Sequence, residues 1–230
     1  LAARAYIAQL APAYDGKGYR LLARTTLADV VGLNPGDTGA AVQYLQNRLR
    51  GLGFWVPGAT GVYDSVTQQA VYAFQKYYGL PRTGSVDAAT RLQFRVATPP
   101  VPRSKSGDLI EIDKTRQIMM IVRSGAAVWT FAISSGSDQT FYEQGSPGPH
   151  IAHTPEGVFT IIRQVDGYDK SPLGVLYRPK YFTWEGHAVH GYTEVPPYPA
   201  SHGCVRVSNT AMDWLWANNM LPIGMPVWVY

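Results

Sequence analysis

The stretch Ser201-His202-Gly203-Cys204-Val205-Arg206-Val207 decides how this chain of 230 residues is interpreted, because it holds the only cysteine. A single cysteine is most often a small buried hydrophobic residue, and that interpretation has to be weighed first. A glycine and two polar residues directly before Cys204 make a poor core strand. We therefore interpret the sulfur as a candidate nucleophile.

A thiol is a strong nucleophile only as the thiolate, and a free cysteine with a pKa of roughly 8.5 is little ionised at neutral pH. A neighbouring imidazole can accept the proton or pair with the anion. His202 lies two positions before Cys204 and would share its face in an extended segment. His190 ends the apolar run Ala188-Val189-His190, which is typical of a strand, so folding can also bring this ring to the sulfur.

The residues around the cysteine suit the recognition of a carbonyl substrate. Gly203 lets a substrate approach the backbone closely, and the N–H groups of Gly203 and Cys204 could bind a developing oxyanion. Arg206 offers a planar guanidinium that matches a carboxylate. Ser201 and His202 are further candidates to steer the substrate.

A zinc site built from His187, His190, His202 and Cys204 is the main alternative chemistry. His187 and His190 are three positions apart in an extended run and so point to opposite faces, whereas metal ligands must converge on one centre. We therefore expect neither a metal nor an organic cofactor. Three aromatic residues flank the histidine strand and are predicted to line a substrate groove. They are Tyr181, Trp184 and Tyr192.

His190-Gly191 together with Ser201-His202-Gly203-Cys204-Val205-Arg206 resembles the signature of the L,D-transpeptidases, the YkuD-type cysteine enzymes of bacterial cell walls. Three upstream segments also resemble parts of that family. They are Asp108-Leu109-Ile110-Glu111-Ile112-Asp113, Thr130-Phe131-Ala132-Ile133-Ser134-Ser135-Gly136 and Thr154-Pro155-Glu156-Gly157-Val158-Phe159. The 14 positions from His190 to Cys204 form a short connection for this family, which leaves the acceptor specificity open.

The resemblance implies a reaction. Cys204, activated by His190, would attack the carbonyl of the L-centred third residue of a peptidoglycan tetrapeptide stem, so that D-Ala leaves and a thioester forms. An amine from a neighbouring stem would then resolve the thioester into a 3→3 crosslink. The family further implies that the Gly191 carbonyl orients the imidazole, that backbone N–H groups near His202, Gly203 and Cys204 stabilise the oxyanion, and that carbapenems acylate the thiol.

Between residues 33 and 97 the apolar periodicity is helical. Apolar residues at steps of three and four form one stripe, Asp64 (or Ser65) and Asp87 are candidate N-caps, and glycines separate three short helices. This segment resembles the peptidoglycan-binding-domain-1 pattern, which implies binding of glycan or stem peptide rather than a purely structural role. The resemblance is carried by Gly36-Asp37-Thr38-Gly39, Val42, Leu45-Gln46, Leu49, Leu52-Gly53, Gly61-Val62-Tyr63-Asp64, Phe74-Gln75 and Gly79-Leu80.

From residue 108 the period changes to two, which predicts a mostly β domain. Strands are expected at 109–113, 117–122, 126–133, 158–165, 188–190 and 226–230. One helix is expected after the cysteine, capped by Ser208 or Asn209. The predicted fold class is multidomain α plus mostly β. Its segments are an N-terminal lead-in at 1–32, a helical peptidoglycan-binding-like domain at 33–97, a Pro-rich linker at 98–106 and an L,D-transpeptidase catalytic domain at 107–230.

Composition narrows the partners. The net charge of +4 is a mild excess that is compatible with wall polymers, and no run of Lys or Arg indicates nucleic acid. No apolar stretch is long enough to cross a membrane, and no secretory leader is recognised at the start. An extracytoplasmic location, in the cell wall or periplasm, is expected from the substrate, with peptidoglycan stems and glycan as partners.

Two other functions stay open at this point. An L,D-carboxypeptidase would use the same thioester with water as the acceptor, and the sequence does not separate it from a transpeptidase. A wall-binding protein with a silent catalytic domain is the alternative from a different class, and the intact Cys204–His190 pair argues against it.

Overall fold

The computed structural model of this chain describes residues 26–143 and 147–230. Of the expected N-terminal lead-in, residues 1–25 lie outside this range, and the described part begins with the 3₁₀ helix η1 (Leu27–Val30). The chain divides into two compact units, Leu1–Gly107 with Val122–Phe131 and Asp108–Ile121 with Ala132–Tyr230. Within the described ranges, no helix is long and apolar enough to cross a membrane.

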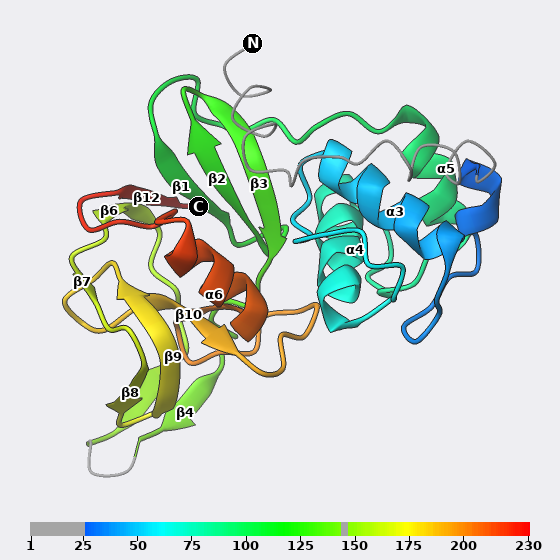
Figure 1. Ribbon diagram of the computed structural model, residues 1–230. Helices are drawn as coiled ribbons and strands as arrows, with labels where there is room; N and C mark the ends of the chain where they lie inside the picture. The colour runs from blue at the N-terminus through cyan, green and yellow to red at the C-terminus, as the bar shows by residue number, and fades with distance from the viewer. Residues whose placement is uncertain (1–25, 144–146) are drawn as a thin grey trace. The chain divides into compact units, whose positions relative to one another are not determined.

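Three α-helices lie in the first unit, called the helical unit below, as the periodicity predicted (Figure 1). They are α3 (Ala40–Gly51), α4 (Ser65–Tyr78) and α5 (Ala88–Val96). The carboxylates of Asp64 and Asp87 accept hydrogen bonds from the N–H groups of Thr67 and Thr90, which makes both aspartates N-caps. Helix α4 ends at Gly79, whose φ of 68° is the left-handed conformation that a glycine C-cap supplies.

A buried glutamine joins α3 to the turn that precedes α4. The Gln46 side chain is 1% exposed, and its Oε1 accepts a hydrogen bond from Gly61 N–H at 2.9 Å. Its Nε2 lies 3.1 Å from Thr60 Oγ1, 2.9 Å from the Val62 carbonyl and 2.8 Å from Thr67 Oγ1. Both ends of the amide are therefore hydrogen-bonded inside the unit, as a buried polar group requires.

The same arrangement recurs between α4 and the turn that precedes α5. Gln75 is fully buried, and its Oε1 accepts a hydrogen bond from Gly84 N–H at 2.9 Å. Its Nε2 lies 2.9 Å from Thr83 Oγ1, 2.9 Å from the Ser85 carbonyl and 3.1 Å from Thr90 Oγ1. The first unit thus contains two copies of one helix–turn–helix joint, called the glutamine joints below. Each copy has a threonine-glycine turn and an aspartate N-cap.

The segment expected to be a linker packs against α4 inside the first unit. Val101 N–H donates a hydrogen bond to Tyr77 Oη at 2.9 Å, and Tyr78 Oη donates to the Thr98 carbonyl at 2.5 Å. Pro100 and Pro102 are buried. Residues 98–102 are therefore held by hydrogen bonds and burial, and do not run free in solvent.

Two main sheets follow in the chain. The first has the strand order β3-β2-β1-β12-β6, in which β1 runs parallel to β12 and β12 antiparallel to β6. Its strands are β1 (Leu109–Asp113), β2 (Ile118–Arg123), β3 (Ala126–Ala132), β6 (Gly157–Thr160) and β12 (Pro226–Val229). The second has the order β11-β10-β9-β7, with β8 paired to β9. Its strands are β7 (Arg163–Gln164), β8 (Tyr168–Ser171), β9 (Gly174–Tyr181), β10 (Ala188–Tyr192) and β11 (Val205–Ser208).

Helix α6 (Asn209–Ala217) follows β11 directly and packs against β9, β10 and β11. Ser208 is its N-cap, because the Ser208 hydroxyl accepts a hydrogen bond from Ala211 N–H at 3.2 Å. This settles the choice between the two caps that the sequence left open. The buried side chains of α6, Ala211, Met212 and Leu215, form the core behind the second sheet.

The single strand expected at 158–165 is divided into β6 and β7. Ile161 exchanges backbone hydrogen bonds with Gly224 and Met225 next to β12, whereas Ile162 N–H donates to the Tyr181 carbonyl at the end of β9. The chain therefore leaves one sheet and joins the other between these two residues. Periodicity could not reveal this change, because an extended backbone continues through it.

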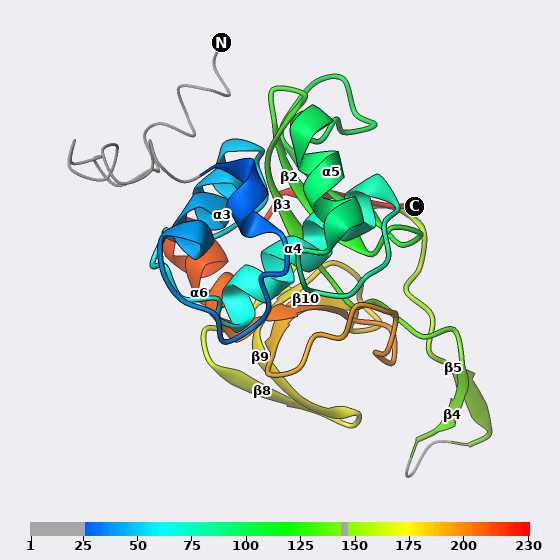
Figure 2. The same cartoon turned by 90° about the vertical axis from the view of Figure 1, so that its right-hand side faces the viewer.

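Two hairpins that the sequence analysis did not predict extend from the second unit, called the catalytic unit below, as separate arms (Figure 2). One is formed by β8 and β9, and the other by β4 (Thr140–Tyr142) and β5 (Pro149–Ile151). Both contribute residues to one cavity, Glu143 from the β4–β5 arm and 169–176 from the β8–β9 arm. The β8–β9 arm therefore forms one wall of the candidate site, and the β4–β5 arm contributes Glu143 to its lining.

Candidate active site

The register of β10 and β11 brings the predicted residues to one face of the second sheet. These parallel strands pair Val189 with Val205 and His190 with Arg206. One step earlier, Cys204 comes beside Ala188, and side chains two residues apart on a strand share a face. Cys204, Arg206 and His190 therefore point the same way, and all three line a cavity of about 760 Å³.

The sulfur of Cys204 lies against the segment before β10. The thiol donates a long hydrogen bond to the Gly186 carbonyl at 3.7 Å. Burial raises the pKa of the Cys204 thiol to about 11, and the Ala188 N–H and the Arg206 charge offset only part of that rise. At neutral pH the sulfur is therefore a protonated thiol, and its reaction requires a base.

The candidate base is His190, which is 4% exposed. Its Nδ1 lies 2.9 Å from the Gly191 carbonyl, and because a carbonyl can only accept, Nδ1 carries the hydrogen. The lone pair is then on Nε2, the other ring nitrogen. Burial lowers the pKa of His190 to about 4, with Arg206 lowering it further and the Gly191 contact raising it. The imidazole is therefore neutral at pH 7 and able to accept a proton.

Ser201 holds the turn that presents the cysteine. Its hydroxyl donates to the Cys204 carbonyl at 2.5 Å and accepts from Gly203 N–H at 3.1 Å, and the residue is 2% exposed. The predicted oxyanion donors are thus unequal, because the Gly203 N–H is already hydrogen-bonded to Ser201. An oxyanion site at this turn would depend on the Cys204 N–H.

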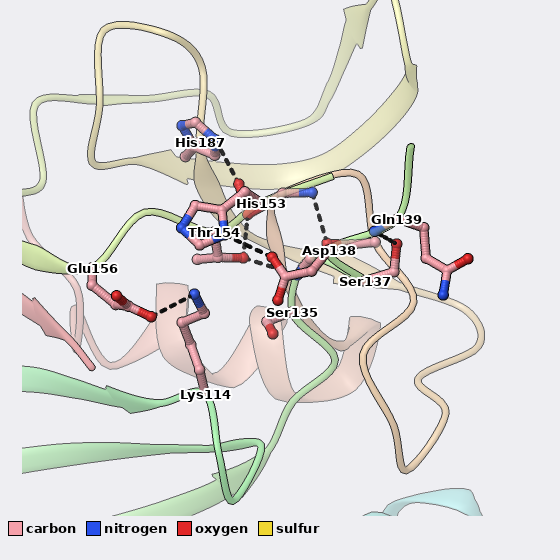
Figure 3. A network of polar contacts seen from close by, with 12 residues as sticks. Lys114, Ser135, Ser137, Asp138, Gln139, His153, Thr154, Glu156 and His187 are labelled. Atoms are coloured by element: carbon pink, nitrogen blue, oxygen red, sulfur yellow. Dashed lines mark hydrogen bonds and ion pairs between the residues drawn. The ribbon is translucent and has the colours of Figure 1, made fainter. Parts of the chain in front are cut away.

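Gly203 is further fixed by Thr154, a residue of the upstream segment that resembled the family pattern. The Thr154 hydroxyl donates to the Gly203 carbonyl at 2.7 Å and accepts from Gly136 N–H at 2.8 Å (Figure 3). Gly203 has φ 135°, and a Cβ there would lie 2.9 Å from the His153 carbonyl oxygen. Only glycine fits this position, because both the backbone angle and the space exclude a side chain.

Arg206 lies across from His190 with its guanidinium stacked on an aromatic ring. The Cζ atom is 4.1 Å from the centre of the Tyr192 ring, and Nη1 donates to the Ala200 carbonyl at 3.2 Å. Its buried Nε has no hydrogen-bond partner among the described residues. Arg206 and Tyr192 both line the cavity.

The other two histidines of the region are held by contacts of their own. His187 Nε2 lies 3.2 Å from the His153 carbonyl and Nδ1 lies 2.9 Å from Thr183 Oγ1, while burial lowers its pKa (Figure 3). His202 is exposed, lines the cavity and stands edge-on to Phe141 of β4, with ring centres 4.7 Å apart. Among the described residues, no group of three or more His, Cys, Asp or Glu side chains could hold a metal ion.

The predicted aromatic residues have different surroundings. Tyr181 lines the cavity, and its hydroxyl donates to Asp169 at 2.7 Å while Arg163 lies 3.7 Å above its ring. Trp184 is 87% exposed and is absent from the cavity lining. Sequence analysis missed the charged pair Arg163 and Asp169. The available signal was the Pro172-Leu173-Gly174 turn between two alternating segments, which is a hairpin pattern.

Comparisons with known proteins identify the family of each domain. The family model of the L,D-transpeptidase catalytic domain, YkuD, matches residues 107–229, and a peptidoglycan binding domain model, PG_binding_1, matches residues 38–93. The crystal structure of an L,D-transpeptidase from Xylanimonas cellulosilytica is 46% identical with a TM-score of 0.81, and covers 86% of this chain and 96% of that one. An L,D-transpeptidase from Stackebrandtia nassauensis is 23% identical with a TM-score of 0.48, covering 87% and 96%. No curated protein sequence matches.

Proposed function

The chain belongs to the L,D-transpeptidase family, and from that premise we propose that it forms 3→3 crosslinks in peptidoglycan through a thioester on Cys204. Both family resemblances read from the sequence are confirmed, and the protein is an L,D-transpeptidase with an added peptidoglycan-binding domain. The observation that supports the proposed chemistry is the β10–β11 register, which gives Cys204 and His190 one face of the sheet and one cavity.

The first half-reaction is acylation of the thiol. His190 Nε2 accepts the Cys204 proton as the sulfur attacks the carbonyl of the third stem residue, and the negative oxygen that develops is bound by the Cys204 N–H. The carbon–nitrogen bond to the terminal D-Ala then breaks. The imidazolium of His190 gives its proton to the leaving nitrogen, so that D-Ala departs with a neutral amino group and a thioester remains.

The second half-reaction transfers the acyl group. The amine of a neighbouring stem attacks the thioester carbonyl, and His190 accepts the proton that the amine loses. The carbon–sulfur bond then breaks, and His190 gives that proton to the departing sulfur, which regenerates the thiol and the neutral imidazole. If water attacks in place of the amine, the product is a tripeptide and the enzyme acts as an L,D-carboxypeptidase. Arg206, which lines the cavity together with Arg163 and Lys170, supports either course as a partner for a substrate carboxylate.

The peptidoglycan-binding domain supports a location at the cell wall, and we extend this to an extracytoplasmic protein of the wall or periplasm. In this proposal the helical unit binds glycan or stem peptide and the catalytic unit acts on stems nearby. Binding of labelled peptidoglycan sacculi by wild-type protein and by the Cys204→Ala variant tests whether wall binding is independent of the catalytic cysteine. Equal retention by both is expected, because the cysteine belongs to the catalytic unit.

The catalytic proposal is tested with tetrapeptide muropeptides and the Cys204→Ala variant. Wild type should release D-Ala and yield crosslinked dimers, whereas the variant should do neither. Mass spectrometry of intact protein after exposure to a carbapenem should show one adduct on wild type and none on the variant. Equal conversion by both proteins would rule out this thiol, tripeptide without dimers would indicate the carboxypeptidase, and inactivity of both would favour a protein that only binds the wall.

A further inference from the structure

The strand β9 bulges opposite the catalytic histidine. Strands β9 and β10 are antiparallel, and their register shifts between Val189 and Gly191. As a result, two residues of β9, Arg178 and Pro179, lie opposite one residue of β10, His190. Such a bulge bends its strand and re-aims the side chains beside it, and bulges occur often next to active sites.

The bulge is fixed by contacts on three sides. Arg178 has φ 50°, a conformation that costs free energy in a residue other than glycine and persists only where its surroundings impose it. Its Nε donates to Asp166 at 2.8 Å and its Nη1 donates to Asp213 of α6 at 2.8 Å. Its carbonyl accepts a hydrogen bond from Trp216 Nε1, also of α6, at 2.8 Å.

A second contact connects α6 to the residue that orients the imidazole. Tyr177 donates its hydroxyl hydrogen to Asp213 at 2.7 Å, so Asp213 binds two consecutive residues of β9. The Tyr177 ring and Asn209 cover Gly191, where a Cβ would lie 2.6 Å and 2.7 Å from their atoms. The carbonyl of that same Gly191 accepts the hydrogen bond from His190 Nδ1.

We infer that Asp213 positions the catalytic histidine through β9. Asp213 holds Tyr177 and Arg178, Tyr177 presses on Gly191, and Gly191 fixes the tautomer and direction of the His190 ring. The inference rests on the proposed role of His190 as the base. Asp213 is a positioning residue and does not touch the reacting atoms, since neither Asp213 nor Tyr177 lines the cavity.

The positions of the charged and titratable groups near His190 show that Asp213 does not act on the imidazole through its charge. Cys204 and Arg206 lie on the cavity side of the sheet together with His190, and Tyr192 of the same strand stands edge-on at 6.1 Å between ring centres. Asp213 is on α6, which covers the other side, and it is not among the groups that shift the pKa of His190. A change at Asp213 therefore reaches the imidazole only by moving the backbone.

The test compares Asp213→Asn with Asp166→Asn, a matched control that also loses one carboxylate partner of Arg178. We expect the second-order rate constant for acylation by a carbapenem, followed by intact mass, to fall about 10-fold in Asp213→Asn and to stay within about twofold in Asp166→Asn. NMR of histidine-labelled protein should show the His190 Nδ1–H signal and the titration midpoint of the ring shifted only in Asp213→Asn.

Equal behaviour of the two variants, or a slower acylation without any change at the His190 ring, would overturn the inference. The NMR measurement needs no turnover, so it judges the inference even if wild-type protein forms no adduct, an outcome that would count against the proposed function alone. Should Asp213→Asn fail to fold, Tyr177→Phe decides, because it keeps the ring on Gly191 and removes one of the two hydrogen bonds to Asp213. Tyr177→Phe should slow acylation about twofold to fivefold and shift the His190 NMR signal. An unchanged His190 signal would refute the inference.

Discussion

The glutamine joints of the helical unit and the Cys204–His190 pair of the catalytic unit both place polar side chains in a buried setting, with opposite results. Gln46 and Gln75 have hydrogen-bond partners at both ends of the amide and carry no charge. Cys204 and His190 are titratable and their pKa values are moved to about 11 and about 4 by burial. Satisfied polar groups stabilise a fold, whereas a desolvated acid and base stay reactive toward a ligand that enters the cavity.

The largest expected effect is at the base. His190→Gln should lower the carbapenem acylation rate about 10²–10⁴-fold, because the glutamine amide cannot accept the thiol proton. Thermal unfolding of the variant should differ little from wild type. His153→Gln is the control, since His153 is an exposed histidine whose ring pairs with Asp138. A decrease of similar size in the acylation rate of His153→Gln would contradict the assignment of His190 as the base.

The second effect is on acid stability. His190 has a pKa of about 4 when folded and about 6.5 when unfolded, so the unfolded chain binds the proton more readily. The stabilisation is therefore complete above about pH 6.5 and is lost as pH falls toward 4, by at most about 3 kcal/mol. Free energies of unfolding of the catalytic unit, measured by denaturant titration at pH 7, 6, 5 and 4, should decline more steeply in wild type than in His190→Gln. Parallel curves would contradict this.

A smaller effect is expected at a glutamine joint. Gln75→Leu removes the acceptor for Gly84 N–H and the donor for the Ser85 carbonyl, so the helical unit should lose about 2 kcal/mol of stability. Acylation by a carbapenem should not change, because no residue of this joint lines the cavity. Calorimetry measures the loss of stability, and intact mass measures the acylation. Gln68→Leu on the same helix serves as the control, and an equal loss there would show that the joint is not special.

The smallest effect should be at Trp184, which belongs to neither region. Because the side chain is 87% exposed, Trp184→Ala should leave the melting temperature within about 1 °C and carbapenem acylation unchanged. If the ring contacts a muropeptide, as the sequence predicted, KM for that substrate should rise about twofold to fivefold. An unchanged KM, measured by D-Ala release, would exclude Trp184 from the substrate site.

Much of the fold was predictable from local patterns. The caps Asp64 and Asp87, the glycine at position 79 and the apolar stripes gave the three helices, because caps and periodicity act within a few residues. The β4–β5 and β8–β9 arms were missed because β4, β5 and β8 are short and partly exposed, and because the longer β9 contains a bulge and little apolar alternation. The same limit hid the division between β6 and β7, where the chain changes sheets without a change in local pattern.

The sequence predicted which residues belong to the candidate site but not the contacts between them. Cys204, His190 and Arg206 were identified from their residue types and spacing, and all three line the cavity. That Ser201 hydrogen-bonds the Gly203 N–H could not be foreseen, because it depends on how the turn closes. Trp184 was chosen for its place beside the histidine strand, but its exposure depends on the loop that carries it.

The amino-acid sequence by itself determined the helices, their caps, the family of each domain and the set of reactive side chains, because these follow from interactions or motifs that are local in the chain. Only the tertiary structure decided which histidine is buried on the sheet face that carries Cys204 and has its pKa lowered by that burial. His202, the nearer in sequence, turns to Phe141 at the surface, while His190 comes into line with Cys204 through strand register. Register and desolvation arise from residues far apart in sequence, and at neutral pH they leave the thiol protonated and the imidazole uncharged.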